Sequence, residues 1–225
     1  MQAEEQLQAQ KPKKKNKSEK FTWWQATLLL IGTLVICLGI GYFISDKYLW
    51  EGTDSEKIAE QVKFYKEQVK QSPNDPESRV QLGYAYFLGK NYDEAIKQYK
   101  TAISLDKNYF DGYLNLSIVY DKQDKTDEAL QHAIKATEIS PRDYKGHLMK
   151  GKSYRKLKMF DEANEALAEA DKLNLGNVDT IYEIGLVAEN QGKKKEAESI
   201  YKEALAYDPT FKPAIKALDR VSSKK

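Results

Sequence analysis

The stretch KTDEALQHAIKATEISP, residues 125–141, decides the fold, because its pattern recurs along the chain at a fixed interval. The same pattern begins at Asn91 (NYDEAIKQYKTAISLDK), at Met159 (MFDEANEALAEADKLNL) and at Lys193 (KKKEAESIYKEALAYDP), so that successive starts are 34 residues apart. Apolar side chains recur at helical spacing within each stretch, which predicts an amphipathic helix. One helix repeated at a constant interval predicts a repeat architecture.

The repeats align as residues 76–109, 110–143, 144–177 and 178–211. Four positions of the alignment carry small or aromatic residues: Gly83, Ser117, Gly151 and Gly185 at the eighth, Tyr86, Tyr120, Tyr154 and Ala188 at the eleventh, Ala95, Ala129, Ala163 and Ala197 at the twentieth, and Ala102, Ala136, Ala170 and Ala204 at the twenty-seventh. The small residues allow two helices of a hairpin, and then successive hairpins, to approach closely. Proline ends the second helix at Pro141 and Pro209. Short polar turns place an Asp before the second helix, where we expect it to cap free N–H groups.

This pattern resembles the tetratricopeptide repeat family over residues 76–211. The resemblance implies an all-α fold of four helix-turn-helix repeats, stacked into a right-handed solenoid with a concave groove. Residues 55–72 have one apolar face and are expected to form an N-terminal flanking helix, and residues 212–225 a C-terminal capping helix. Such end helices are needed because a terminal repeat cannot bury its outer face alone.

The N-terminal part of the sequence has a different composition. Residues 21–45 contain no charged side chain, and about 20 apolar residues suffice to span a bilayer. We expect one transmembrane helix here, kept as a signal anchor because the apolar run is longer than that of a cleaved signal peptide. Residues 46–54 would form a juxtamembrane linker. Residues 1–20 are polar and contain six lysines, which predicts a disordered basic tail.

The lysines of the tail predict the orientation of the protein. Lys and Arg accumulate on the cytoplasmic side of membrane helices, so we expect the N-terminus in the cytoplasm and the repeats outside it. The arrangement resembles that of anchored repeat proteins in the bacterial plasma membrane. Thr33, Cys37 and Gly41 recur every four residues and form a stripe of small side chains. Such a stripe allows close pairing of two copies of the helix, and hence a homodimer.

Charge and cysteine content exclude several classes of function. Residues 1–53 hold seven lysines and five acidic residues, out of 36 basic and 34 acidic residues in all, which leaves 29 of each in residues 54–225. A neutral domain disfavours nucleic acid as a partner. Cys37 is the single cysteine and lies within the apolar stretch, so residues 54–225 can form no disulfide and no cysteine metal site.

The sequence predicts no catalytic, cofactor or metal site. The only histidines are His132, at a position expected to face outward, and His147, at a packing position. A glycine-rich phosphate loop, an H-E-x-x-H pair and a serine nucleophile elbow are all absent from the sequence. We therefore expect a non-enzymatic protein without a cofactor.

The resemblance implies that the first helix of each repeat lines the concave groove. Transferred to this sequence, the predicted groove consists of Tyr84, Phe87, Leu114, Asn115, Ile118, Lys145, Leu148, Met149, Lys152, Arg155, Lys156, Tyr182 and Leu186. The apolar members would form a track for an extended or helical segment, unless the end helices of the chain cover part of it. The basic members favour a partner with an acidic segment or a C-terminal carboxylate; the alternative is an ordinary solvated helix. Asn115 and Lys145 match two positions of a chaperone-tail clamp, which Val80, Tyr84 and Met149 leave incomplete.

These features predict a membrane-anchored scaffold or adaptor that holds a protein or peptide partner in its groove during assembly of an envelope or membrane complex. The architecture resembles that of bacterial anchored repeat proteins, including those that present apocytochrome c to the haem-attachment machinery. A permanent accessory subunit of a membrane complex is the alternative, since both would present the same sequence pattern.

Overall fold

The computed structural model describes residues 23–44 and 51–222, and within these ranges every regular element is an α-helix. The predicted all-α class is therefore confirmed. The chain divides into two compact units, Met1–Thr53 and Asp54–Lys225. The helices are α1 (Trp23–Ile44), α2 (Glu51–Gln71), α3 (Pro76–Leu88), α4 (Tyr92–Leu105), α5 (Phe110–Lys122), α6 (Thr126–Ile139), α7 (Tyr144–Lys156), α8 (Phe160–Leu173), α9 (Val178–Asn190), α10 (Lys194–Tyr207) and α11 (Lys212–Ser222).

Helix α1 of the first unit is uncharged, and its large apolar side chains are exposed, Leu30 at 70% and Leu38 at 64%. In the part of the chain that the structure describes, none of the helices is both long and apolar enough to cross a membrane. Both ends of the predicted span, residues 21, 22 and 45, lie outside the described residues, as does the predicted tail, residues 1–20. The transmembrane helix stays a prediction.

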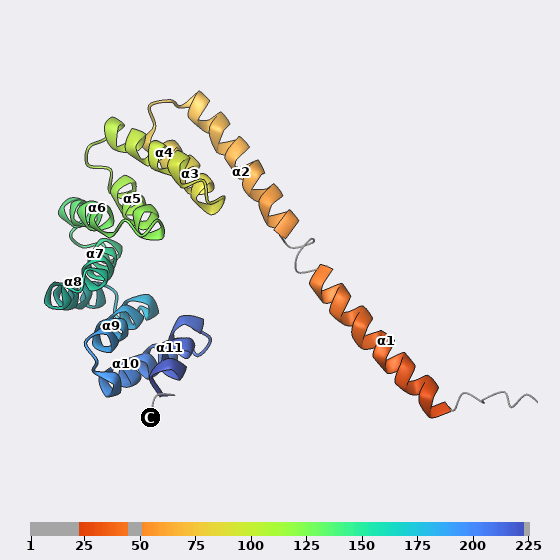
Figure 1. Ribbon diagram of the computed structural model, residues 1–225. Coiled ribbons are helices and arrows are strands. Elements are labelled where there is room, and N and C mark those ends of the chain that lie inside the picture. Colours follow the sequence, from red (N-terminus) through yellow and green to blue (C-terminus); the bar gives the residue numbers. More distant parts are fainter. Residues whose placement is uncertain (1–22, 45–50, 223–225) are drawn as a thin grey trace, which may run out of the picture. The chain divides into compact units, whose positions relative to one another are not determined.

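The second unit contains four helix hairpins in succession. Helix α3 packs against α4, α5 against α6, α7 against α8, and α9 against α10, and α11 packs against α9 and α10. The first helices also contact one another in order, from α3 through α5, α7 and α9 to α11. Within this unit the first helices line the inner side of the arc and the second helices its outer side (Figure 1). The inner row is where the predicted groove residues lie.

Each hairpin turns through the same backbone motif. At the end of α3, Lys90 N–H donates to the carbonyl of Phe87, and Asn91 N–H donates to that of Tyr86. The same pair of bonds recurs in the other three hairpins, which is the Schellman pattern that satisfies the last carbonyls of a helix. The motif needs one residue at positive φ: Lys90 (59°), Asp124 (56°), Lys158 (62°) and Gly192 (80°).

The expected aspartate caps of the second helices are not formed. The cap positions of α4, α6, α8 and α10 show no side-chain hydrogen bond, and Asp93, Asp127 and Asp161 lie inside the first turn instead. The reason is the Schellman turn, which starts α4, α6 and α8 one residue before the aspartate and puts the cap position two residues before it. A carboxylate in the first turn still interacts favourably with the helix dipole. Side-chain caps occur on first helices, where Asp143 accepts a hydrogen bond from Lys145 N–H at 2.9 Å.

The hairpins are held together by a small residue on the first helix facing a larger one on the second. A Cβ added at Gly83 would lie 2.5 Å from Tyr99 Cε1, and one added at Gly151 would lie 2.5 Å from Leu167 Cγ. Tyr99 and Leu167 are both fully buried. Repeat two carries the fully buried Ser117 in place of glycine and Ala133 in place of the large residue. The smaller partner on the second helix explains why serine is accommodated there.

Gly83→Ser should destabilise the protein by about 2 kcal/mol, because the new side chain collides with the Tyr99 ring. Tyr99→Ala alone should cost about 4 kcal/mol, since it leaves a cavity. The double variant recreates the Ser117–Ala133 pair and should cost less than the sum of the single changes. Urea unfolding followed by circular dichroism measures all three variants. Additive losses would show that the two positions do not pack as a pair.

Candidate functional site

The predicted groove residues differ widely in exposure. On the inner row, Tyr84 is 46% exposed and Lys145 is exposed, whereas Leu114 is 5% and Met149 9% exposed. The remaining predicted residues are half-buried: Phe87, Asn115, Ile118, Leu148, Lys152, Arg155, Lys156, Tyr182 and Leu186. The structure therefore brings the predicted residues onto one row of helices but does not leave them equally accessible.

The sequence predicts a continuous apolar track along the groove, but the structure interrupts this track at its centre. Leu114 and Met149 pack together with Ala133 and Ala136 in a buried cluster. Ala133 occupies the position at which the other repeats carry Tyr99, Leu167 and Tyr201. Tyr182 and Leu186 also pack into a core cluster, with residues of α10 and α11.

Within the four repeats, the exposed large apolar side chains of the first helices lie on α3; Ile215 on α11 is 38% exposed. Tyr84 and Leu88 are 46% and 38% exposed, and they lie one helical turn apart on the same face. The Tyr84 ring stacks on that of Phe87 at 6.3 Å between centroids, which supports its orientation. Leu88 also lies at a transferred groove position of the first repeat, and it extends the exposed apolar face of Tyr84 by one turn.

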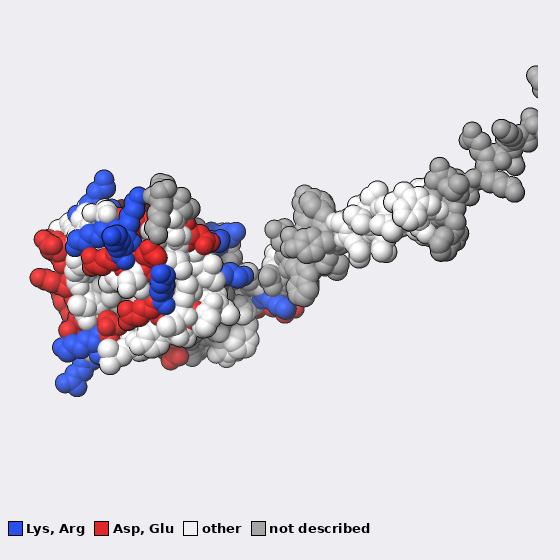
Figure 2. Space-filling view, turned by 90° about the horizontal axis from the view of Figure 1, so that it is seen from below, with Lys and Arg blue, Asp and Glu red and all other residues white. Residues whose placement is uncertain are grey.

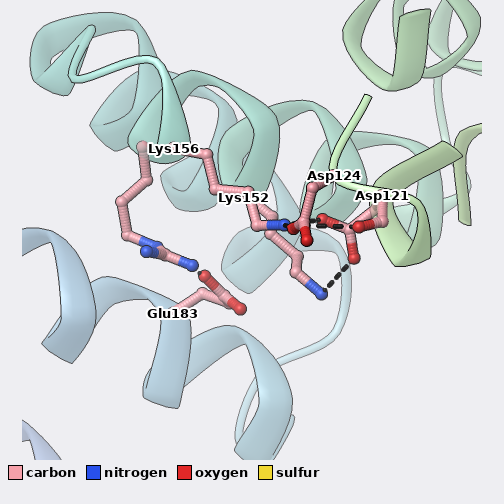
Figure 3. Close-up of polar contacts among 6 residues, drawn as sticks. Asp121, Asp124, Lys152, Lys156 and Glu183 are labelled. Carbon is pink, nitrogen blue, oxygen red and sulfur yellow. Dashed lines mark hydrogen bonds and ion pairs between the residues drawn. The ribbon is translucent and has the colours of Figure 1, made fainter. Parts of the chain in front are cut away.

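Two of the predicted basic residues are paired with one aspartate. Lys152 Nζ lies 2.8 Å from Asp121 Oδ2, and Lys156 Nζ lies 2.8 Å from Asp121 Oδ1 (Figure 3). Lys156 also reaches Asp124 Oδ1 and the backbone carbonyl of Asp121, at 3.3 Å each. These contacts join α7 to the end of α5. Asp121 is buried, 5% exposed, so its charge depends on the two lysines.

The pKa values show that the Asp121 cluster stays charged. Burial acts to raise the pKa of Asp121, but the hydrogen bonds and charges of Lys152 and Lys156 outweigh it and hold this pKa below its usual range. Burial acts to lower the pKa of Lys156, but Asp121 and Asp124 together raise it above its ordinary value. Proton uptake or release near neutral pH would therefore not break the cluster.

Two further ion pairs continue the series along the inner row. Arg155 Nε on α7 donates to Glu183 Oε2 on α9 at 2.8 Å. Glu189 on α9 accepts hydrogen bonds from Arg220 Nε and Nη2 on α11, both at 2.6 Å. We call the pairs centred on Asp121, Arg155 and Glu189, all at the twelfth position of their repeats, the ion-pair ladder. It links α5 to α7, α7 to α9 and α9 to α11.

The ladder changes what the basic residues can do. Lys152, Arg155 and Lys156 already have acidic neighbours, and of the four predicted basic groove residues only Lys145 has no ion-pair partner within residues 23–44 and 51–222. On the face seen in Figure 2, basic and acidic side chains of the repeat unit are interspersed. Asp121, Glu183 and Glu189 lie at predicted groove positions, but their pairing with basic residues of neighbouring first helices was not predicted from the sequence. Opposite charges at inner positions one repeat apart would have indicated this pairing.

The histidines have structural contacts. The His132 ring on α6 stacks on Tyr120 at 5.4 Å with an interplanar angle of 5°. His147 Nε2 donates to the carbonyl of Pro141 at 3.0 Å. Among the described residues, no group of three or more His, Cys, Asp or Glu side chains could hold a metal ion.

Family comparisons agree with this geometry. A family model described as "Tetratricopeptide repeat" matches residues 110–143, 144–177 and 178–211, and one described as "TPR repeat" matches residues 83–124. Together they cover 129 of the 225 residues. The chain belongs to the tetratricopeptide repeat family. Each of the three matched ranges begins at the first residue of a first helix, α5, α7 or α9. No curated protein matches the sequence.

Solved structures share the fold at low sequence identity. YrrB, described as "a TPR protein with an unusual peptide-binding site", has a TM-score of 0.58 at 19% identity, over 73% of this chain and 85% of that one. TTC0263, a thermophilic protein of Thermus thermophilus, has a TM-score of 0.60 at 22% identity, over 72% and 87%. MamA of Desulfovibrio magneticus RS-1 has a TM-score of 0.59 at 20% identity, over 77% and 96%. At these identities the likeness shows the helical solenoid.

Asp121→Asn should lower the free energy of unfolding by about 2 kcal/mol at pH 7, because it leaves two lysines without their buried counter-charge. The contribution of Asp121 is complete above its unfolded-state pKa of about 3.9 and is lost as the pH falls through its lower folded-state pKa. The difference in the free energy of unfolding between the wild type and the variant should therefore become smaller below about pH 4. Asp124→Asn is the control, because this exposed carboxylate should contribute little. An equal loss in both variants would contradict the role given to Asp121.

His132 should make stability fall in mild acid. Burial, and then the charge of Lys100, lowers the His132 pKa against the opposing effect of Glu128. The folded protein then binds fewer protons than the unfolded chain, so stability is complete above about pH 6.5 and declines as the pH falls through the folded-state pKa. Thermal unfolding between about pH 7.5 and pH 5.5 measures this decline. His132→Phe keeps a stacked ring and should make the stability depend less on pH in this range. An unchanged decline in the variant would assign the effect to another group.

Proposed function

We propose that this protein is a non-enzymatic scaffold or adaptor that binds a segment of a protein partner on the inner row of its repeats. The observation that carries the proposal is the exposure of Tyr84 and Leu88 on α3, beside the half-buried Ile118 on α5. Large apolar side chains gathered on one exposed face are typical of interaction sites. YrrB, a structure with the same fold, is described as having a peptide-binding site, which supports the proposal by analogy.

The finer proposal is that the scaffold is held at the bacterial plasma membrane by a single apolar segment. Its support is the absence of charge over residues 21–45, the six lysines of residues 1–20 and the exposed apolar side chains of α1. The lysines favour an N-terminus in the cytoplasm and repeats outside it, since Lys and Arg accumulate on the cytoplasmic side. Thr33, Cys37 and Gly41 would form the contact in a homodimer of the anchor. Anchoring would concentrate the bound partner at the membrane during assembly of a complex.

Two modes of action fit this scaffold. An assembly factor, of which a chaperone for apocytochrome c is one form, releases its partner after each round. A permanent accessory subunit keeps its partner. Pulse-labelled partner should exchange from the complex within minutes in the first case and stay bound in the second, because only turnover requires fast dissociation.

Site-specific photo-crosslinking in intact cells tests the use of the inner row. A photoreactive amino acid at Tyr84 or Ile118 should capture one discrete protein, because both positions lie on the proposed surface. The same group at Gln131 on α6 or Glu165 on α8, both exposed on second helices, should not. Crosslinks formed only from α6 and α8 would show that the interface lies on the outer row. The absence of crosslinks from every position would contradict the proposed function.

A further inference from the structure

We propose that the surface made by α3 and α5 recognises a partner segment in which basic side chains lie close to apolar ones. We call it the α3–α5 surface and define it by Glu77, Tyr84, Leu88, Asp111 and Ile118. The inference rests on the proposed function and adds the chemistry of the partner. It reverses the expectation, drawn from the basic residues of α7, that the partner is acidic.

Helical spacing orders the groups of the α3–α5 surface. Glu77, Tyr84 and Leu88 are seven and then four residues apart on α3, which places them on one face. Asp111 and Ile118 repeat the first spacing on α5, the neighbouring helix of the inner row. At about 1.5 Å per residue, each carboxylate lies about 10 Å along its helix from the apolar group. The surface therefore has an acidic edge and an apolar edge, and both run from α3 to α5.

The acidic edge is a local concentration of negative charge. Tyr109, half-buried at the start of α5, has a pKa raised first by burial and then by four carboxylates, Asp111, Glu77, Asp75 and Asp106. Asp75 is committed to capping α3, where it accepts hydrogen bonds from the Glu77 and Ser78 N–H groups. Asp106 Oδ1 likewise accepts a hydrogen bond from Asn108 N–H at 2.8 Å. Asp106, Glu77 and Asp111 are exposed, and none of the three has an ion-pair partner within the described ranges.

Two basic residues belong to the same part of the chain. Arg79 is engaged elsewhere, because its guanidinium donates to the Pro73 carbonyl at 3.0 Å and to the Gln98 side chain at 3.3 Å. Lys107 is exposed and lies in the turn beside Asp106. One lysine does not balance the three exposed carboxylates, so the acidic edge attracts a positive group from a partner.

An acidic partner would meet less favourable conditions further along the row. To bind Lys152, Arg155 or Lys156 it would have to replace Asp121 and Glu183, which are buried and already ion-paired. Lys145, exposed on α7 at the same repeat position as Glu77 and Asp111, offers such a partner a single unpaired charge within the described residues. Displacing a buried carboxylate leaves its charge uncompensated, and that cost opposes binding. The exposed carboxylates of Glu77 and Asp111 thus lie on the same two helices as the exposed Tyr84 and Leu88 and the half-buried Ile118, and both kinds of group favour a basic and apolar segment.

Three synthetic peptides of equal length test the chemistry of the partner: repeated Lys–Ser–Leu, Glu–Ser–Leu and Lys–Ser–Ser units. Fluorescence anisotropy would measure their binding to the full-length protein in phosphatidylcholine nanodiscs, with empty nanodiscs as the blank. The Lys–Ser–Leu peptide should bind at least about tenfold more tightly than either of the others, because it alone satisfies both edges.

Matched variants locate the binding on the molecule. Glu77→Lys with Asp111→Lys should weaken the Lys–Ser–Leu peptide by about tenfold or more. Asp93→Lys with Asp127→Lys changes the net charge equally, also in first turns of helices, and should leave binding unchanged. Tyr84→Gln with Leu88→Gln should weaken it too, whereas Met159→Gln with Leu175→Gln, at exposed apolar residues of the third repeat, should not. Circular dichroism checks folding, and Glu77→Gln with Asp111→Asn replaces any lysine variant that fails it.

Several outcomes would overturn the inference. Equal or tighter binding of the Glu–Ser–Leu peptide would make the partner acidic. Equal losses in the test and control variants would show attraction by net charge alone. A change of oligomeric state in the Glu77→Lys, Asp111→Lys variant would assign the surface to a second copy of this chain. Failure of all three peptides, together with crosslinking from Tyr84 and Ile118, would reject this partner chemistry and leave the proposed function standing.

Discussion

The close approach of the two helices in each hairpin is the constraint on which the rest of the repeat unit depends. The Gly83–Tyr99 and Gly151–Leu167 contacts leave no room for a side chain on the first helix. They fix the spacing of the hairpin, and the fully buried alanines of the second helices then allow the next hairpin to stack. Repeat two reaches the same spacing with Ser117 and Ala133, so the combined size of the pair matters more than the identity of either residue.

On this frame the inner row divides into two parts of different chemistry. From α5 to α11 the ion-pair ladder satisfies the charges of neighbouring helices within the protein itself. On α3 and the start of α5 carboxylates and apolar groups are left exposed. Nearly identical hairpins thus present different inner surfaces. The close approach of the two helices fixes residue size at the eighth and twentieth positions, but it does not fix the residues at the inner positions.

The sequence predicts the repeats well, because period and residue size are local properties that packing makes obligatory. It predicts the inner residues less well for a physical reason. Whether Lys152 is free depends on Asp121, 31 positions earlier in the chain, and on the distance between successive first helices. Leu114 and Met149 are buried in a cluster with Ala133 and Ala136 of α6, and a groove position transferred from the family does not include such contacts with the second helix. The missing aspartate caps follow from a turn in which lysine and aspartate adopt the positive φ usual for glycine.

The ladder also has a mechanical consequence. From α3 to α11, each helix contacts only helices up to two places away in the described structure, so any bending of the unit occurs at the joints between neighbouring hairpins. Ion pairs on the inner side hold the first helices of neighbouring hairpins together from α5 to α11 and oppose the opening of these joints. Between α3 and α5 the described residues show no such ion pair. The first joint of the array is therefore held by the apolar core that α3 and α4 share with α5, and its exposed apolar side chains lie beside a joint that no ion pair among the described residues crosses.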